Sequence, residues 1–314
     1  MTIPFEGTPL AAQEGAIREL EELGYTDLWS AEAMGGDGLT PLALASVWAP
    51  SMRLGTAILP VFTRGPALLA QSAAAMASAA PGRFVLGIGT SSDVIVERWN
   101  GVPFESPYAR IRDTVRFLRA VLSGEKVTEE YETFAVKGFR LGIEVAEPVP
   151  IVVAALREGM LRLAGRVGDG AIVNWLSPDD VTRVAGIVHE ENADAEIVAR
   201  IFVAPTTDRE TVMSAGRFVL ASYLNVPVYR EFHRWMGRED ALGEHWEQWA
   251  AGDRRGALEK IPESVVDELL VHGSAADCRA RIDEYVANGV DCPALAILPL
   301  GDVDLSEAIR GLAP

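Results

Sequence analysis

The strongest constraint in this sequence is an alternation between short apolar runs and longer stretches with helical spacing. Each apolar run is long enough for one strand, and the stretch that follows repeats its apolar residues as one face of a helix does. Such an alternation predicts parallel strands joined by crossover helices. The predicted strands lie at about residues 2–5, 26–30, 53–58, 83–88, 151–154, 170–174, 199–203 and 294–298.

These runs match the strands of an α/β fold, the (β/α)8 TIM barrel, which takes about 250 residues as one domain and tolerates insertions. The chain has 314 residues. We therefore expect a single domain over residues 1–314, with a helical insertion between strands 7 and 8 at about residues 205–270. Residues 124–150 are expected to form a long surface loop.

Aromatic residues gather in the predicted insertion. They are Tyr223, Tyr229, Phe232, Trp235, Trp246 and Trp249. Large aromatic side chains dominate the energetics of packed cores, so such a group favours a core inside the insertion. A lid over the active site is the alternative.

The formal net charge of −17 disfavours partners that are themselves negatively charged. Acidic residues number 45 against 28 lysines and arginines, so the average surface repels nucleic acid and anionic lipid. We expect no nucleic-acid partner and no membrane partner. An anionic cofactor would need a local site built from backbone N–H groups with an arginine.

The cysteines and the N-terminal residues indicate a cytoplasmic protein. Cys278 and Cys292 lack the spacing of a metal site or a disulfide framework, so we expect reduced thiols and no metal. The first residues lack the basic and apolar regions of a signal peptide, and no apolar stretch is long enough to span a bilayer.

The residues that follow each strand of a parallel barrel meet at one face, where candidate site residues are expected. After the second strand, Glu32 leads into a glycine-rich turn and is a candidate for proton transfer, with bonding to neighbouring backbone as an equal alternative. After the third strand, Ala57 and Ile58 lie in a run of small and β-branched residues that permits a bulge and the approach of a flat ring.

Two further strand ends are suited to bind an anion. Gly89, Thr90 and Ser91 follow the fourth strand and offer N–H and hydroxyl donors, although the third glycine of the dinucleotide fingerprint is missing. The fifth strand leads into a helix whose N-terminus can hold a phosphate. Its first residues are Ala155, Leu156, Arg157, Glu158, Gly159 and Met160. The Glu158 carboxylate satisfies the same helix end without a ligand, so both interpretations stay open.

Motifs of acid–base or nucleophilic catalysis are missing. The histidines fall in predicted helices or their flanks, where packing or surface roles are favoured, and no HExxH, GxSxG or CxxC pattern occurs. The histidines are His189, His233, His245 and His272. This pattern is typical of an enzyme whose reactive chemistry belongs to a cofactor.

With these residues in view, the chain resembles the luciferase-like monooxygenase superfamily, in particular its branch that uses the deazaflavin coenzyme F420. The matching segments in chain order are 24–29, 54–66, 82–92, 99–104 with Arg110, 164–170, 273–274 and 289–291. They extend over nearly the whole chain, and their order is more specific than any one of them.

The resemblance implies an oxidoreductase that transfers a hydride between F420, bound across the barrel mouth, and a small organic substrate. A bulge at Ala57–Ile58, often a non-prolyl cis peptide in the family, would support the ring. The coenzyme's phosphate would lie near Gly89, Thr90 and Ser91 and the helix start at 155–160. Trp29 and Asn174 are expected near the substrate or ring, and Glu32 in catalysis. Homodimers are frequent in the family, and the helix after Pro66 is the candidate interface.

Two departures from the family's pattern matter. Ala33 stands where relatives that oxidise a sugar alcohol carry a histidine base, which disfavours that reaction here. Leu156 and Arg157 stand where several relatives have a Gly-Gly pair. We therefore expect the backbone to approach the phosphate less closely here and the charge of Arg157 to compensate for the weaker contact. The alternatives are an FMN-dependent monooxygenase of the same fold and a non-catalytic ligand-binding barrel that has lost the coenzyme.

Overall fold

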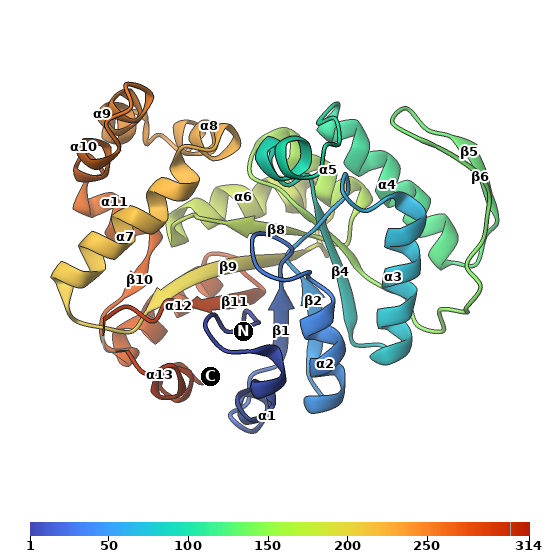
Figure 1. The fold of residues 1–314 in the computed structure, drawn as a ribbon, viewed down its shortest axis with the longest axis horizontal. Helices are drawn as coiled ribbons and strands as arrows, with labels where there is room; N and C mark the ends of the chain where they lie inside the picture. The colour runs from blue at the N-terminus through green and yellow to red at the C-terminus, as the bar shows by residue number, and fades with distance from the viewer. Residues whose placement is uncertain (302) are drawn as a thin grey trace.

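The computed structural model describes residues 1–301 and 303–314 and has the predicted α/β barrel (Figure 1). Its parallel ladder runs in the order β1–β2–β4–β7–β8–β9–β11, with β3 paired to β4 and β10 paired to β9. The strands are β1 (Asp27–Ser30), β2 (Arg53–Thr56), β3 (Leu59–Pro60), β4 (Phe84–Gly89), β7 (Ile151–Ala154), β8 (Gly170–Asn174), β9 (Glu196–Ala204), β10 (Val271–His272) and β11 (Cys292–Ile297).

Helices surround this ladder, and several of them begin at signals written in the sequence. Ser177 and Ser274 form capping boxes with the aspartates three residues later, at the starts of α6 and α12. The helices outside the insertion are α1 (Glu14–Glu22), α2 (Thr40–Trp48), α3 (Pro66–Ala79), α4 (Pro107–Leu122), α5 (Glu158–Val167), α6 (Pro178–Glu191), α12 (Ala275–Ala287) and α13 (Leu305–Gly311), with a 3-10 turn η1 (Leu10–Ala12) and a π-helix η2 (Val94–Trp99).

The ring is closed by the first residues of the chain, although the predicted strand at 2–5 is only a short bridging segment. The Thr2 N–H donates to the Leu295 carbonyl of β11 at 2.7 Å, and the Ile3 N–H donates to the Trp29 carbonyl of β1 at 2.8 Å. Pro4 has no N–H with which to continue the pairing. The predicted first strand is therefore a short bridging segment, whose backbone hydrogen bonds to β1 and β11 complete the ring.

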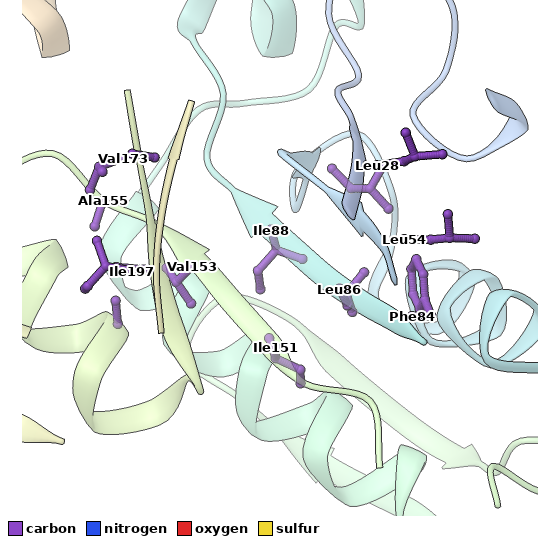
Figure 2. Packing of buried hydrophobic residues seen from close by; sticks show 14 of the residues in the cluster. Leu28, Leu54, Phe84, Leu86, Ile88, Ile151, Val153, Ala155, Val173 and Ile197 are labelled. Atoms are coloured by element: carbon purple, nitrogen blue, oxygen red, sulfur yellow. The ribbon is translucent and has the colours of Figure 1, made fainter. Parts of the chain in front are cut away.

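Side chains alternate between the inside of the barrel and the shell under the helices. Trp29, Val85, Val152, Ile172 and Val198 pack together inside. Their neighbours along the strands pack outward in the main core, as the labelled side chains in Figure 2 show. This alternation decides whether the side chain of a strand residue points into the barrel or toward the helices.

The N-terminal end of the barrel is filled by an ion-paired arginine. Arg53, the first residue of β2, pairs with Asp27 of β1 and donates from Nη1 to Glu196 Oε2 of β9 at 2.9 Å. Its guanidinium lies 5.6 Å from the Trp29 ring centroid. A ligand site is therefore expected at the opposite end, where the strands finish.

Two predicted segments differ from the structure. The strand expected at 53–58 ends at Thr56, and a cis peptide between Ala57 and Ile58 separates it from the two-residue β3. The surface loop expected at 124–150 contains an antiparallel hairpin, β5 (Val127–Glu130) and β6 (Ala135–Phe139), which stands beyond α4 at the edge of the molecule (Figure 1). One face of this hairpin is exposed, and the other packs against the main core through Val127, Val136 and Phe139. Its few apolar residues alternate with polar ones, so no continuous apolar run marks its strands in the sequence.

The predicted helical insertion lies between β9 and β11 and gathers at the end of the molecule opposite the hairpin (Figure 1). Its helices are α7 (Arg209–Leu224), α8 (Pro227–Trp235), α9 (Glu239–Ala250), α10 (Arg254–Glu259) and α11 (Glu263–Leu269). No helix in the described residues is long and apolar enough to cross a membrane.

The aromatic group of the insertion does not form one core as expected. Trp246 is buried inside the insertion, whereas Phe232 belongs to the main core of the barrel. Tyr223 and Tyr229 meet at ring centroids 5.3 Å apart, and Tyr223 contacts Trp175 at 5.0 Å, directly after β8. The insertion thus has its own core and also covers part of the barrel mouth.

Candidate active site

The ends of the third, fourth and fifth predicted strands, now β2 with β3, β4 and β7, meet at the barrel mouth. A Cβ atom added to Gly89 at the end of β4 would lie 2.9 Å from Ile58 Cγ1 and 3.0 Å from Ala154 Cβ. The Val61 N–H donates to the Gly89 carbonyl at 3.0 Å. Only a residue without a side chain fits between these neighbours. The expected convergence of these three turns is confirmed.

Small or aliphatic side chains line this side of the mouth. Ala57, Ile58 and Ala154 pack against the interior cluster, with Gly89 between them. The Ala57 N–H donates to the Ser30 carbonyl at 2.6 Å, and the Ile58 carbonyl accepts from the Glu32 N–H at 3.1 Å. We call Ala57, Ile58, Gly89 and Ala154 the small-residue half of the mouth.

The loop after β4 presents polar groups beside this half. Thr90 and Ser91 are half-buried, and Ser91 has a φ of 62°, the left-handed conformation. The π-helix η2 follows within three residues, a type of irregularity that is frequent at functional sites. Thr90 and Ser91 therefore lie where the sequence placed them, next to Gly89 at the mouth.

The N-terminus of α5 is open beside the same loop. Arg157 is the exposed N-cap residue and its side chain makes no capping hydrogen bond, in contrast to Ser177 at α6. The Glu158 carboxylate bonds to Arg162 one turn later at 3.1 Å, so it does not cap the helix. Gly159 is also exposed. The first N–H groups of this helix are therefore available to an anion.

The other predicted members of this helix start point elsewhere, which corrects their assignment to the coenzyme. Ala155 is 3% exposed, packs in the outer core (Figure 2), and donates its N–H to the Ile172 carbonyl at 3.0 Å. Leu156 and Met160 are half-buried against the same outer core. Their side chains support the turn and do not line the mouth.

Glu32 lies beside the Ile58 peptide and is held by an arginine. Arg64 donates from Nη2 to Glu32 Oε2 at 2.7 Å and from Nε to both carboxylate oxygens at 3.0 and 3.2 Å. The two side chains are 17% and 20% exposed, so solvent screens this pair only partly. The structural alternative of bonding to backbone is weak, since the Gly38 N–H lies 3.4 Å from Oε2.

Trp29 does not reach the mouth, which corrects its expected contact with a substrate or ring. It is 1% exposed, lies under Arg53, and fills the space beside Gly55, where a Cβ atom would overlap its ring. Its position in the barrel interior gives it a packing role.

Polar side chains form the other side of the mouth. Asn174 ends β8 and donates from Nδ2 to the Tyr229 hydroxyl of α8 at 3.2 Å. Arg200 of β9 is the ladder partner of Asn174, and its guanidinium lies 4.7 Å from the Phe202 ring. Burial raises the pKa of the Tyr229 phenol to about 12, and the nearby Arg200 charge offsets part of this shift. We call Asn174, Arg200 and Tyr229 the polar half of the mouth.

Sequence reasoning missed Arg64, Arg200 and Tyr229 as site residues. Arg200 carried a usable signal, because a charged residue inside a buried parallel strand breaks the apolar run expected there. Arg64 and Tyr229 carried no such signal, because their partners Glu32 and Asn174 are 32 and 55 residues away in the chain.

Three of the histidines lie on helices, and His272 ends β10, the short strand paired with the end of β9. His189 contacts the Ala195 carbonyl at 3.0 Å, and His272 contacts Asp267 at 2.8 Å. His233 and His245 are fully buried in the insertion helices α8 and α9. A hollow of about 460 Å³ is remote from the mouth, since residues of α7, α10 and α11 line it.

The fold defines a TIM-barrel protein in which the ends of β2, β4 and β7 meet at the barrel mouth. The chain belongs to the luciferase-like monooxygenase family, whose model matches residues 3–292. A Mycobacterium tuberculosis protein named as a coenzyme F420-dependent oxidoreductase is 26% identical over 95% of this chain and 92% of its own length.

Two further similarities concern part of the chain or the fold alone. An F420-dependent glucose-6-phosphate dehydrogenase of Kineococcus radiotolerans is 36% identical over 49% of this chain and 49% of its own length. A solved coenzyme F420 dependent tetrahydromethanopterin reductase from Methanopyrus kandleri has a TM-score of 0.81 at 20% identity, and the match covers 100% of this chain and 96% of that one. The predicted (β/α)8 fold is confirmed.

Proposed function

We propose that this chain is an F420-dependent oxidoreductase that transfers a hydride between the coenzyme and a small organic substrate at the barrel mouth. Relatives that carry F420 in their names match most or half of the chain. The observation that carries the proposal is the meeting of Ile58, Gly89 and Ala154 at one side of the mouth, where only a glycine fits between the other two residues.

The residues present fit such a coenzyme. Ile58, Gly89 and Ala154 would support a flat ring from behind, because a larger side chain at Gly89 would displace the other two. Thr90, Ser91 and the open N-terminus of α5 would hold a phosphate through hydroxyl and N–H donors, with Arg157 adding charge. The bound coenzyme supplies the hydride chemistry, and the chain supplies position and the exclusion of water.

Glu32 is the proposed proton-handling group. It lies at the end of β1 beside the Ile58 peptide, next to the proposed ring position. Arg64 donates to both of its oxygens and fixes the carboxylate in one orientation. This position beside the proposed ring site is the basis for assigning proton transfer to Glu32.

The direct test is a fluorescence titration of the purified chain with F420 and, separately, with FMN. We expect saturable binding of F420 and turnover of the bound coenzyme with an organic substrate. Tight binding of FMN without binding of F420 would instead support the monooxygenase alternative. Saturable binding of neither cofactor at tens of micromolar, or roughly −6 kcal/mol, would support the non-catalytic barrel.

We also propose that the chain forms a homodimer through α2 and α3. Val47 and Leu68 on these neighbouring helices are 72% and 52% exposed, which is unusual for aliphatic side chains on a helical face. Light scattering should give the mass of a dimer for the wild type and of a monomer for Val47→Glu. Phe218→Glu, at an equally exposed position on α7, is the matched control and should stay dimeric.

The proposed location is the cytoplasm. Both cysteines, Cys278 and Cys292, are buried and free in the structure, which suits a reducing compartment. Localisation of a fluorescently tagged chain would test this, and export of the chain would contradict it.

A further inference from the structure

The strongest unassigned feature is an arginine on the inner face of β9. Residues 196, 198, 200, 202 and 204 share this face, because Val198 packs inside the barrel and the side chains alternate. Glu196 at the base is neutralised by Arg53, at 2.9 Å. Arg200 near the mouth has no carboxylate partner in the described residues, and its buried Nε atom has no hydrogen-bond acceptor.

Most arginines that are at least half-buried have an acceptor within the chain. Arg53, Arg64 and Arg238 form ion pairs with carboxylates. Arg83, Arg110 and Arg217 donate to backbone carbonyls. Only Arg200 and Arg230 have neither among the described residues, and of these two only Arg200 stands on a barrel strand. A chain with a net charge of −17 offers many carboxylates, yet none of the described ones lies next to Arg200. A buried donor on a charged group is costly to leave unpaired. The guanidinium is therefore suited to an acceptor that comes from outside the chain.

The surroundings hold Arg200 in place. Its ladder partners are Asn174 on β8 and the small Ala294 on β11. The guanidinium lies over Phe202, which stacks on Trp175 at 3.9 Å with an interplanar angle of 11°. This stack fixes the orientation of the charged group before a ligand arrives.

Asn174 adds a second unsatisfied group at the same place. Its Nδ2 bonds to the Tyr229 hydroxyl, whereas its buried Oδ1 has no partner in the described residues. Rotating the amide by half a turn would exchange the two atoms, so that a hydroxyl proton reaches Oδ1 and the N–H donors become free. In either orientation one polar end of this side chain lacks a partner.

We propose that Arg200, assisted by Asn174 and Tyr229, binds a carboxylate group of the substrate. The planar guanidinium fork matches a carboxylate, and one arginine balances its single charge, whereas a phosphate dianion would need more positive charge. That the bound carboxylate belongs to the substrate of the hydride transfer rests on the proposed function. The prediction that Arg200 binds a carboxylate is independent of that function.

The test is isothermal titration of the full chain with benzoate, benzamide and phenyl phosphate, with and without F420. Benzoate and benzamide have similar shapes and differ in charge, so their comparison isolates the guanidinium. We expect benzoate to bind at least about tenfold more tightly than benzamide and than phenyl phosphate. Arg200→Gln should abolish the preference, and Arg200→Lys should retain part of it, because lysine keeps the charge and loses the planar fork.

Arg255→Gln is the matched control, since Arg255 is 93% exposed on the insertion, and it should keep the full preference. The proposal is overturned by equal binding of benzoate and benzamide, by tighter binding of phenyl phosphate, or by an intact preference in Arg200→Gln. Absence of saturable benzoate binding at about 10 mM also overturns it. If Arg200→Gln does not fold, the wild-type comparison and Arg200→Lys decide.

A separate fluorescence titration with F420 distinguishes this inference from the proposed function. If the wild-type chain does not bind F420 but prefers benzoate in an Arg200-dependent way, the proposed function is rejected and the carboxylate site is kept. If it binds F420 but shows no preference for benzoate, the function is kept and the carboxylate site is rejected.

Discussion

The two halves of the barrel mouth are built in opposite ways. The small-residue half comes from neighbouring strand ends, and its shape depends on side chains that are short or missing, with Gly89 between Ile58 and Ala154. The polar half combines the ends of β8 and β9 with a helix of the insertion, and its character depends on the side chains present. The first half suits a flat coenzyme, and the second suits recognition of a substrate.

The coverings of the two halves differ as well. The connections that follow β3, β4 and β7 border the small-residue half, whereas α8 of the insertion covers the polar half with Tyr229. The same helix buries His233, whose ring nitrogens have no hydrogen-bond partner in the described residues. Under the proposed function, this difference predicts that coenzyme binding depends mainly on the backbone and on Gly89, while substrate binding depends on how the insertion docks.

The largest expected effect is loss of the coenzyme from Gly89→Val. The added Cβ would lie about 3 Å from Ile58 and Ala154, so the larger side chain must push them into the ring position. F420 affinity should fall at least about 100-fold by fluorescence titration, while benzoate affinity stays within about threefold. Gly186→Val, at a helix position with open space, is the control. Unchanged F420 affinity in Gly89→Val would remove the distinction between the halves.

The next effect concerns the stability of the protein in acid, which depends on His233 of α8. Burial, with a smaller contribution from Arg238, lowers the pKa of His233 to about 3, below its unfolded value of about 6.5. The unfolded chain then binds more protons, so stability is complete above about pH 6.5 and falls toward pH 3. At pH 5 the loss relative to pH 8 should be about 2 kcal/mol from this group.

His233→Phe should lose less stability than the wild type between these two pH values, in urea unfolding followed by circular dichroism. Phe232→Leu, on the same helix, is the packing control and should change stability equally at both pH values. An identical pH dependence of stability in His233→Phe and the wild type would show that folding does not lower the pKa of His233.

A smaller effect tests whether Glu32 only anchors Arg64. Glu32→Gln and Arg64→Gln should each cost about 1–2 kcal/mol of unfolding free energy, since the pair is mostly buried, and the double variant should cost little more than either one. The exposed pair of Glu14 and Arg18 is the control and should couple by less than about 0.5 kcal/mol.

Turnover separates the two roles of Glu32. Proton handling predicts that Glu32→Gln changes the pH profile of turnover and that Arg64→Gln mainly lowers the rate. Identical pH profiles in both variants and the wild type would reject the catalytic assignment.

The smallest effect is expected from Tyr229→Phe in the polar half. Loss of the hydroxyl removes the 3.2 Å hydrogen bond with Asn174 and should cost about 0.5–1.5 kcal/mol. Benzoate binding should weaken about threefold and F420 binding should stay unchanged, measured by the same titrations. Tyr223→Phe, in the same aromatic cluster, is the control. Weaker F420 binding in Tyr229→Phe would mean that the halves are not separate.

Much of the fold followed from local patterns, and the failures have identifiable causes. The hairpin β5–β6 escaped prediction because its few apolar residues alternate with polar ones and form no continuous apolar run. Residues 2–5 have a strand-like run, but Pro4 limits their pairing to a bridge. At the site, the location of Gly89, Thr90 and Ser91 at the end of a strand could be predicted because it follows from the local sequence. Trp29 was misplaced because its depth along the barrel axis is not a local property.

The sequence by itself determined the order of strands and helices, the position of the insertion and the residues that stand at each strand end. These are properties of short stretches, in which periodicity and turn residues act over one or two turns of chain. The tertiary structure alone decided that Arg64 holds Glu32, that Tyr229 reaches Asn174 and that Arg200 points into the mouth. Such pairs depend on ring closure, strand register and the docking of α8, which are set by packing between distant segments.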